Sequence, residues 1–138
     1  MKNLILYTTA LFFLATAISC EKNDIAAPPA IDLTVEVEGV SVQAPDDKVT
    51  EQTGKRIDYT FTIRANATIA QVRTINSTIL SSEVKTVDET ITMGFTDQRT
   101  GQIVGTVYVA TIGTEVAIVV TDTDGNEARR ALTILPQN

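Results

Sequence analysis

The only cysteine of the chain, Cys20, has the position that most directly predicts chemistry. It follows residues 4–19, which are mostly apolar or small, and these in turn follow the positive charge of Lys2. A charged start, an apolar segment and small residues before a cleavage point are typical of a secretory signal peptide. Cys20 ends the apolar segment, the small Ser19 precedes it, and no second cysteine can pair with it inside the chain. These observations argue against a buried free thiol and against half of an intermolecular disulfide.

The residues around Cys20 resemble a known processing signal. Residues 17–20, Ala-Ile-Ser-Cys, are similar to the lipobox of bacterial lipoproteins, in which the cysteine is acylated and becomes the mature N-terminus. This resemblance implies that residues 1–19 are a lipoprotein signal peptide and that Cys20 carries acyl chains such as palmitate. Each buried methylene contributes about 0.8 kcal/mol, so two or three chains would anchor the protein on a membrane. Plain signal-peptide cleavage and an uncleaved anchor are the alternatives.

The residues after Cys20 carry a second resemblance. Residues 21–24, Glu-Lys-Asn-Asp, are similar to the charged export signal of Bacteroidetes-type surface lipoproteins. The resemblance implies a lipoprotein of the outer membrane that faces the periplasm or the cell surface, and a solvated linker is the alternative. Residues 20–30 as a whole, with a Pro-Pro pair near their end, predict a flexible lipidated tether.

Oxygen-bearing side chains gather near the C-terminus, where they could coordinate a metal. Asp122, Asp124 and Asn126 offer hard oxygen ligands within a short loop, as Ca²⁺ prefers. A calcium loop of this kind needs a bidentate glutamate about twelve positions along, and none stands there. Asp, Gly and Asn are also the residues that a tight turn favours for backbone reasons. We therefore expect a turn and no cofactor, with these three residues as the metal candidates.

Tyr108 is the aromatic candidate for ligand binding. Sugar sites commonly stack a ring on Trp or Tyr, and the chain has no Trp. Alternation of polar and apolar residues places Tyr59, Phe61 and Phe95 on the inward faces of strands. Tyr108 is then the aromatic side chain expected on the surface. One tyrosine offers only a small surface on which a sugar ring could stack. Glycan binding is therefore the second hypothesis, after interaction with a protein.

Residue types that enzymes commonly use are scarce. The chain contains no histidine, which is the usual general base. Glu36 and Glu38 have the spacing of two carboxylates on one strand face, but the solvent side of an amphipathic strand has the same spacing. No phosphate-binding glycine motif occurs. We expect a protein that is not an enzyme.

The net negative charge of the chain limits the kinds of partner that it can bind. Eleven basic residues stand against seventeen acidic ones, a formal charge of −6, and loss of Lys2 with the signal peptide would make it −7. Nucleic-acid binding requires clustered Lys and Arg, so we expect no nucleic-acid partner. An acidic surface also disfavours docking on anionic headgroups, so the lipid alone would hold the protein at the membrane.

Strands are the elements expected to position these residues. Alternation of apolar and polar residues, or a continuous apolar run, predicts strands with a face in a core. Six segments show one of these patterns: 31–38, 57–64, 90–96, 103–111, 115–121 and 127–135. Residues 115–121 are apolar enough for a central strand covered on both sides. Residues 69–75 predict a bulged strand, and residues 78–86 predict a loop or irregular edge.

Turn residues connect these segments. Residues 97–101 and 122–126 each contain Asp and Gly and predict hairpins, with Gly101 supplying a positive φ in the first. About seven short strands without helices predict one domain, residues 31–138, folded as an all-β antiparallel β-sandwich.

The last two predicted strands resemble a known domain class. Residues 116–128 are similar to the closing hairpin of bacterial immunoglobulin-like domains, in which an apolar strand runs into an Asp-x-x-Gly-Asn turn. The resemblance implies an immunoglobulin-like fold and assigns no activity, because many functions share this fold.

Two functional hypotheses follow. The first is a membrane-anchored lipoprotein of the cell envelope that presents a non-enzymatic, immunoglobulin-like interaction or accessory module to a protein partner. The alternative is a glycan-binding accessory of a polysaccharide-uptake system. An exposed edge strand suited to pairing would favour the first. A cleft centred on Tyr108 with convergent Asn, Asp or Arg side chains would favour the second.

Overall fold

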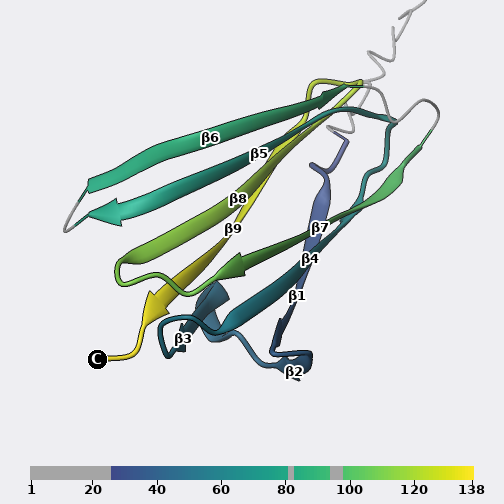
Figure 1. The fold of residues 1–138 in the computed structure, drawn as a ribbon. Helices are drawn as coiled ribbons and strands as arrows, with labels where there is room; N and C mark the ends of the chain where they lie inside the picture. The colour runs from purple at the N-terminus through teal and green to yellow at the C-terminus, as the bar shows by residue number, and fades with distance from the viewer. Residues whose placement is uncertain (1–25, 81–82, 94–97) are drawn as a thin grey trace, which may run out of the picture.

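The computed structural model describes residues 26–80, 83–93 and 98–138 and shows two β-sheets that pack face to face (Figure 1). Sheet A has four strands in the order β2-β1-β4-β7, and sheet B has five in the order β3-β9-β8-β5-β6. The strands are β1 (Ala30–Val37), β2 (Val40–Val42), β3 (Lys48–Glu51), β4 (Arg56–Arg64), β5 (Ile69–Leu80), β6 (Glu83–Met93), β7 (Thr100–Tyr108), β8 (Gly113–Asp122) and β9 (Glu127–Pro136). The predicted all-β sandwich is confirmed.

The described residues form nine strands where about seven were expected. The two additional strands, β2 and β3, are short, and they flank a single 3₁₀ turn, η1 (Pro45–Asp47). Strand β3 pairs in parallel with β9, so the expectation of a wholly antiparallel sandwich is wrong for this pair. Strands of three and four residues are too short to show an alternation of apolar and polar residues.

One buried cluster joins the two sheets. Alternate residues of β4 contribute Ile57, Tyr59, Phe61 and Ile63, whose exposed fractions do not exceed 7%. Sheet B adds alternate residues of β5, β8 and β9: Val72, Val116, Ile118, Val120, Leu132 and Ile134. A strand points successive side chains to opposite faces, so the residues between these lie on the outer faces of the sandwich.

Strand β8 lies inside sheet B, between β9 and β5, as its apolar composition predicted. Every residue from Val116 to Val120 is buried, including Ala117 and Val119, which do not belong to the core cluster. Val119 is flanked in register by Arg73 of β5 and Arg129 of β9. Arginine stems can cover apolar surface while their charged ends stay in water. Neighbouring side chains of the same face therefore shield the outer side of β8.

Strands β5 and β6 form a long hairpin. The prediction of a bulged strand at residues 69–75 is confirmed, because the pairing of β5 with β8 shifts register between Ile69 and Gln71. For residues 78–86, the expected loop is wrong, since β5 continues to Leu80 and β6 begins at Glu83. The alternative of an irregular edge fits β6, which is the outer strand of sheet B and shifts its register with β5 between Asn76 and Ser77. Thr78 and Ile79 lack an apolar periodicity but pair with both β6 and β8. Backbone pairing on two sides overrides the weak local pattern.

The segment before β7 is a crossing between sheets. Residues 97–101 were expected to form a hairpin, but β6 belongs to sheet B and β7 to sheet A. Gly101 lies within β7 opposite Ile63 and is not among the glycines with positive φ. Turn residues mark a change of direction and carry no information about which sheet the next strand joins. The second predicted hairpin, at residues 122–126, is confirmed, with Gly125 at φ 82°.

Gly105 allows β7 to lie close to an aromatic core residue. It is the cross-strand partner of Tyr59, and a Cβ atom at Gly105 would collide with the phenol ring of Tyr59. The absence of a side chain at this position lets the ring of Tyr59 lie over the backbone of β7. Tyr59 also packs against Phe61, with ring centroids 5.6 Å apart.

The residues that precede β1 already contact the sandwich. Pro29 is buried, and Nδ2 of Asn66 donates to the carbonyl of Ala27 over 3.5 Å. Strand β1 begins at Ala30, one residue before the expected domain start. The predicted signal peptide, Cys20 and residues 21–24 lie outside the described residues. In the described part of the chain, no helix has the length and apolar character needed to cross a membrane.

Candidate functional site

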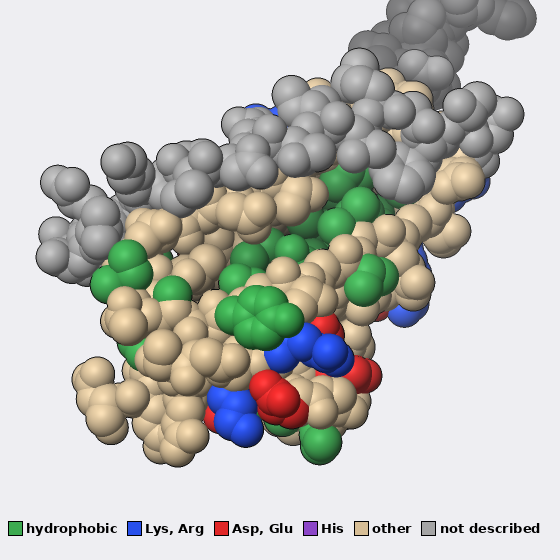
Figure 2. All heavy atoms as spheres, in the orientation of Figure 1, with side chains coloured by type: hydrophobic (Ala, Val, Ile, Leu, Met, Phe, Trp, Pro, Cys, Tyr) green, Lys and Arg blue, Asp and Glu red, His purple; other side chains and the backbone are tan. Residues whose placement is uncertain are grey.

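A groove of about 500 Å³ lies on the outer face of sheet A. Strands β1, β4 and β7 supply its lining through their outward-facing residues. The lining residues are Thr34, Glu36, Arg56, Asp58, Thr60, Val104, Thr106 and Tyr108. On the face of the molecule shown in Figure 2, hydrophobic, basic and acidic side chains lie close together. The groove therefore combines exposed apolar surface with charge.

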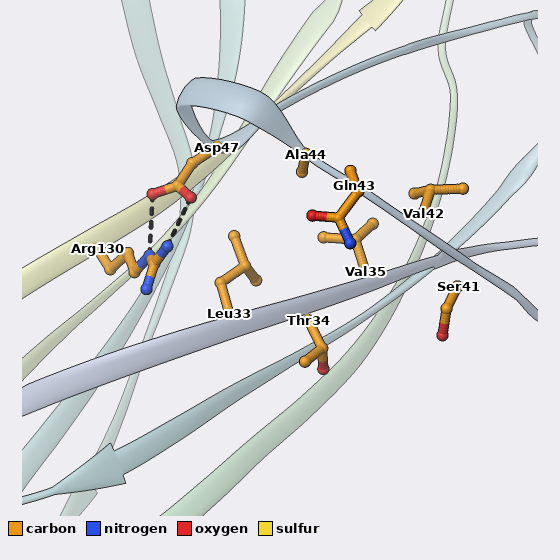
Figure 3. A pocket seen from close by; sticks show the side chains of 9 residues that line it. All are labelled: Leu33, Thr34, Val35, Ser41, Val42, Gln43, Ala44, Asp47 and Arg130. Carbon is orange, nitrogen blue, oxygen red and sulfur yellow. Dashed lines mark hydrogen bonds and ion pairs between the residues drawn. The ribbon is translucent and has the colours of Figure 1, made fainter.

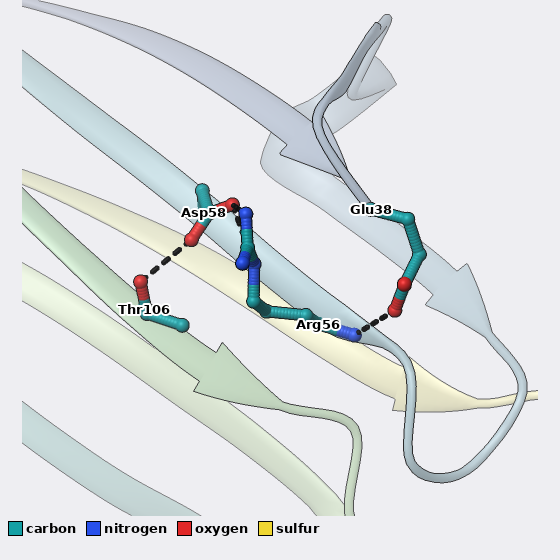
Figure 4. Close-up of polar contacts among 4 residues, drawn as sticks. All are labelled: Glu38, Arg56, Asp58 and Thr106. Carbon is teal, nitrogen blue, oxygen red and sulfur yellow. Dashed lines mark hydrogen bonds and ion pairs between the residues drawn. The ribbon is translucent and has the colours of Figure 1, made fainter.

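A polar network joins β4 to β7 inside this groove (Figure 4). Nε of Arg56 donates to Oδ2 of Asp58 over 2.9 Å, and its terminal nitrogen lies 2.8 Å from the same oxygen. The hydroxyl of Thr106 donates to Oδ1 of Asp58 over 2.6 Å. Arg56 thus binds one oxygen of the Asp58 carboxylate and Thr106 binds the other, which fixes the side chains of Arg56 and Thr106 relative to each other.

The turn between β1 and β2 holds the backbone of Arg56. Glu38 and Gly39 have φ values of 51° and 80°, as in the two-residue turns that close hairpins. The amide of Arg56 donates to Oε1 of Glu38 over 2.7 Å, and the amide of Glu38 donates to the carbonyl of Arg56 over 3.0 Å. Glu38 therefore lies in the turn and binds the backbone, whereas Glu36 lies on the outer face of β1. The expectation that the two carboxylates share one strand face is wrong.

Hydrogen bonds move the pKa values of Asp58 and Arg56 further from neutral pH. The hydroxyl of Thr106 lowers the pKa of Asp58; partial burial opposes this shift, and Arg56 adds to it through its hydrogen bond and its charge. Asp58 in turn raises the pKa of Arg56. At neutral pH the groove therefore presents a carboxylate and a guanidinium side by side.

Tyr108 and Val104 form the apolar part of the groove. Tyr108 is 63% exposed and Val104 is 70% exposed, so the prediction that Tyr108 lies on the surface is confirmed. Tyr108 is the cross-strand partner of Arg56, which places the phenol ring beside the guanidinium. Tyr59 and Phe61 face the core as predicted, and Phe95 lies outside the described residues. A ring, a guanidinium and a carboxylate thus share one small surface.

A second groove, of about 370 Å³, lies where the edges of the two sheets meet (Figure 3). Nε and Nη2 of Arg130 donate to the two oxygens of Asp47 over 2.9 and 2.8 Å, and Nη1 donates to the carbonyl of Ile31 over 2.6 Å. Arg130 belongs to β9 of sheet B and Ile31 to β1 of sheet A. All three guanidinium nitrogens are engaged, so this arginine connects the two sheets.

The three metal candidates lie in the β8–β9 turn. Oδ1 of Asp122 accepts hydrogen bonds from the amides of Asp124 and Asn126 over 3.0 and 2.8 Å, and Oδ2 accepts one from Nδ2 of Asn126 over 3.0 Å. Burial acts to raise the pKa of Asp122, but these donated hydrogen bonds outweigh it and lower the pKa. The carboxylate of Asp122 therefore binds N–H groups of its own turn. Among the described residues, no three His, Cys, Asp or Glu side chains cluster as a metal site.

Arg56, Asp58 and Thr106 were not identified as site residues from the sequence. Arg56 and Asp58 alternate with Ile57 and Tyr59, so their outward direction could be read from the strand pattern. The residue of β7 that lies opposite Asp58 depends on the register between two strands far apart in the sequence. Strand pattern alone does not determine that register.

Comparison with known proteins identifies no family. No protein-family model matches the sequence, and no curated protein matches it. Among solved structures, the chain is similar to the sporulation control protein Spo0M from Bacillus subtilis, with a TM-score of 0.48 and 13% sequence identity. The match covers 81% of this chain and 50% of that protein, so the chain spans about half of Spo0M.

Proposed function

We propose that this protein is a non-enzymatic lipoprotein of the outer membrane, anchored through Cys20, whose β-sandwich is a binding module. Support for the anchor comes from the sequence around Cys20, and the sandwich begins soon after it, at Ala30. The observation that carries the binding role is the groove on sheet A, in which Tyr108 lies beside the network of Arg56, Asp58 and Thr106.

The groove favours a glycan as the ligand. A sugar ring has an apolar face, which can pack on the exposed ring of Tyr108, and hydroxyls, which can bond to charged groups at its edge. Asp58 accepts hydrogen bonds as a carboxylate, and Arg56 supplies N–H donors. Ligand sites usually combine apolar walls with a few polar groups that fix orientation. A glycan-binding accessory of a polysaccharide-uptake system fits this chemistry, and a protein ligand in the groove is the competing outcome.

Glycan-array binding by residues 21–138 tests this proposal. We expect a specific glycan signal that falls at least about tenfold in Tyr108→Ala, because loss of a stacked ring removes about 1.4 kcal/mol or more. Asp58→Asn should weaken the same signal, since it removes the charge that orients Arg56. Val40→Ala is the matched control, because Val40 is 65% exposed and does not line the groove.

Two results would contradict the glycan proposal. If no glycan binds above background, the groove has another ligand, which cross-linking on intact cells should identify as a protein. If a glycan binds equally well to the unsubstituted domain, Tyr108→Ala and Asp58→Asn, the sugar site lies elsewhere on the molecule.

A further inference from the structure

The outer edges of the two sheets differ in how they are protected against pairing. An edge strand exposes unpaired N–H and C=O groups, and natural proteins protect such edges with short strands or charged residues. Strands β2 and β3 have only three and four residues. The edges that these two strands form therefore follow the usual pattern.

Strand β7 is an edge strand without this protection. Its nine residues, Thr-Gly-Gln-Ile-Val-Gly-Thr-Val-Tyr, include no charged residue and no proline. Among the described strands it pairs with β4 and ends sheet A, so its second edge is open. Val104, at its centre, is 70% exposed on the outer face. A long, uncharged edge of this kind is suited to β-strand addition.

The sequence of β7 is complementary to itself in one antiparallel register. With a twofold axis at Val104, all nine residues find a partner, and Ile103 faces Gly105 of the second copy while Val107 faces Gly101. Moving the axis by one residue to either side would place branched residues opposite each other and glycines opposite each other. Only the central register pairs large with small along the whole inner face, and it brings the two exposed Val104 side chains together.

Tyr59 gives the facing residue a surface to pack on. Its ring reaches over Gly105, where a Cβ atom would collide with it. A branched side chain on the next strand, opposite Gly105, would therefore meet aromatic surface, and aromatic rings commonly cover glycines at sheet edges in this way.

We propose that β7 pairs with β7 of a second copy of this chain, in the register centred on Val104, to form a continuous eight-stranded sheet. The twofold symmetry uses the open edge of both copies, so the assembly stops at a dimer. The two grooves then lie on one shared outer face. The proposal depends on the edge of β7 alone and does not depend on which ligand the groove binds.

Disulfide cross-linking of residues 21–138, which contain every described strand and no cysteine, tests the contact. In antiparallel sheets, directly opposed Cα atoms lie about 4.5–5.5 Å apart, within disulfide range. Val104→Cys should form a covalent dimer under mild oxidation about tenfold faster than Val40→Cys, because pairing raises the local thiol concentration. Val40 is a matched control, since its exposure of 65% is similar to that of Val104 and it lies on β2.

Two cysteine variants test the register. Gln102 faces Thr106 of the second copy, so a mixture of Gln102→Cys and Thr106→Cys should give mainly the mixed dimer. Each variant alone should cross-link slowly, because its two cysteines would lie four residues apart along the strands, about 14 Å. Rapid cross-linking of either variant alone would exclude this register.

Sedimentation of the unsubstituted domain and of Val104→Lys completes the test. Two opposed lysines repel each other, so Val104→Lys should sediment as a monomer while its circular dichroism matches that of the unsubstituted domain. Because Val104 is exposed, the substitution leaves the core intact. A single-chain mass for the unsubstituted domain at every concentration, with equal cross-linking of Val104→Cys and Val40→Cys, would overturn the proposal.

Discussion

At the scale of single residues, two aspartates have pKa values below the ordinary range for different reasons. Asp58 lies on an open strand face and is held by Thr106 and Arg56. Asp122 is 2% exposed and is held by N–H groups of its own turn. The carboxylate of Asp58 belongs to the groove, whereas that of Asp122 stabilises the fold. Removal of the first should therefore affect ligand binding, and removal of the second should affect stability.

Thr106→Val should raise the pKa of Asp58 toward its ordinary value. The hydroxyl of Thr106 is the largest cause of the lowered pKa, and valine preserves the shape of the side chain without a donor. NMR titration of the Asp58 carboxyl carbon measures the shift. Thr60→Val, in the same groove, serves as the control and should leave this pKa nearly unchanged. An unchanged pKa in Thr106→Val would show that the hydrogen bond contributes little in solution.

Asp122→Ala should lower the free energy of unfolding at pH 7 by about 1–3 kcal/mol, because it leaves N–H groups of the turn without an acceptor. Since the folded pKa of Asp122 is lowered, its contribution is present above the unfolded value of about 3.9 and is lost as the pH falls through the folded value. The free energy of unfolding in urea, measured between pH 2 and 7, should therefore fall less with decreasing pH in the variant than in the unsubstituted domain.

Asp124→Ala is the control for the turn. Its side chain is exposed, and only its amide binds Asp122, so its effect should stay within about 0.5 kcal/mol. Equal destabilisation by the two substitutions would mean that the carboxylate of Asp122 is not what stabilises the turn.

At the scale of the elements, Arg130 connects the edges of the two sheets. It binds both oxygens of Asp47 and the carbonyl of Ile31, and its side chain is 32% exposed. Arg130→Met should destabilise the domain by about 1–3 kcal/mol, since three hydrogen bonds from a charged group are lost. Chemical denaturation measures the change.

Arg129→Met is the matched control on the same strand. Arg129 forms one ion pair with Glu115, at 2.7 Å, and its side chain is 52% exposed. Exposed pairs of this kind contribute about 0–1 kcal/mol. If Arg129→Met were as destabilising as Arg130→Met, the hydrogen bonds of Arg130 between the sheets would contribute no more than an exposed ion pair.

At the scale of the whole molecule, the proposed lipid on Cys20 would determine where the domain resides. Cys20→Ser should move the protein from the membrane fraction to the soluble fraction of fractionated cells, because serine cannot carry the thioether-linked lipid. Immunoblotting of the fractions with and without detergent measures the change. Retention of Cys20→Ser in the membrane fraction would contradict a lipid anchor and favour an uncleaved N-terminal segment.

Much of the fold could be predicted from local patterns. The strict alternation around Tyr59 and Phe61 identified β4 and the inward direction of both rings, because a strand with one buried face requires that period. The same logic placed Tyr108 on the surface. Short strands such as β2 and β3 have too few residues for a period, and the end of β5 is held by two neighbouring strands instead of by its own pattern.

The sequence by itself determined the all-β class, the strand faces, the β8–β9 turn and the exposure of Tyr108, because each depends on residues adjacent in the chain. Only the tertiary structure decided which strands are neighbours. Pairing of β4 with β7 brings Thr106 to Asp58 and Tyr108 to Arg56, although about fifty positions separate these residues. The groove and the open edge of β7 both follow from this pairing, which is set by the packing of two sheets over one core.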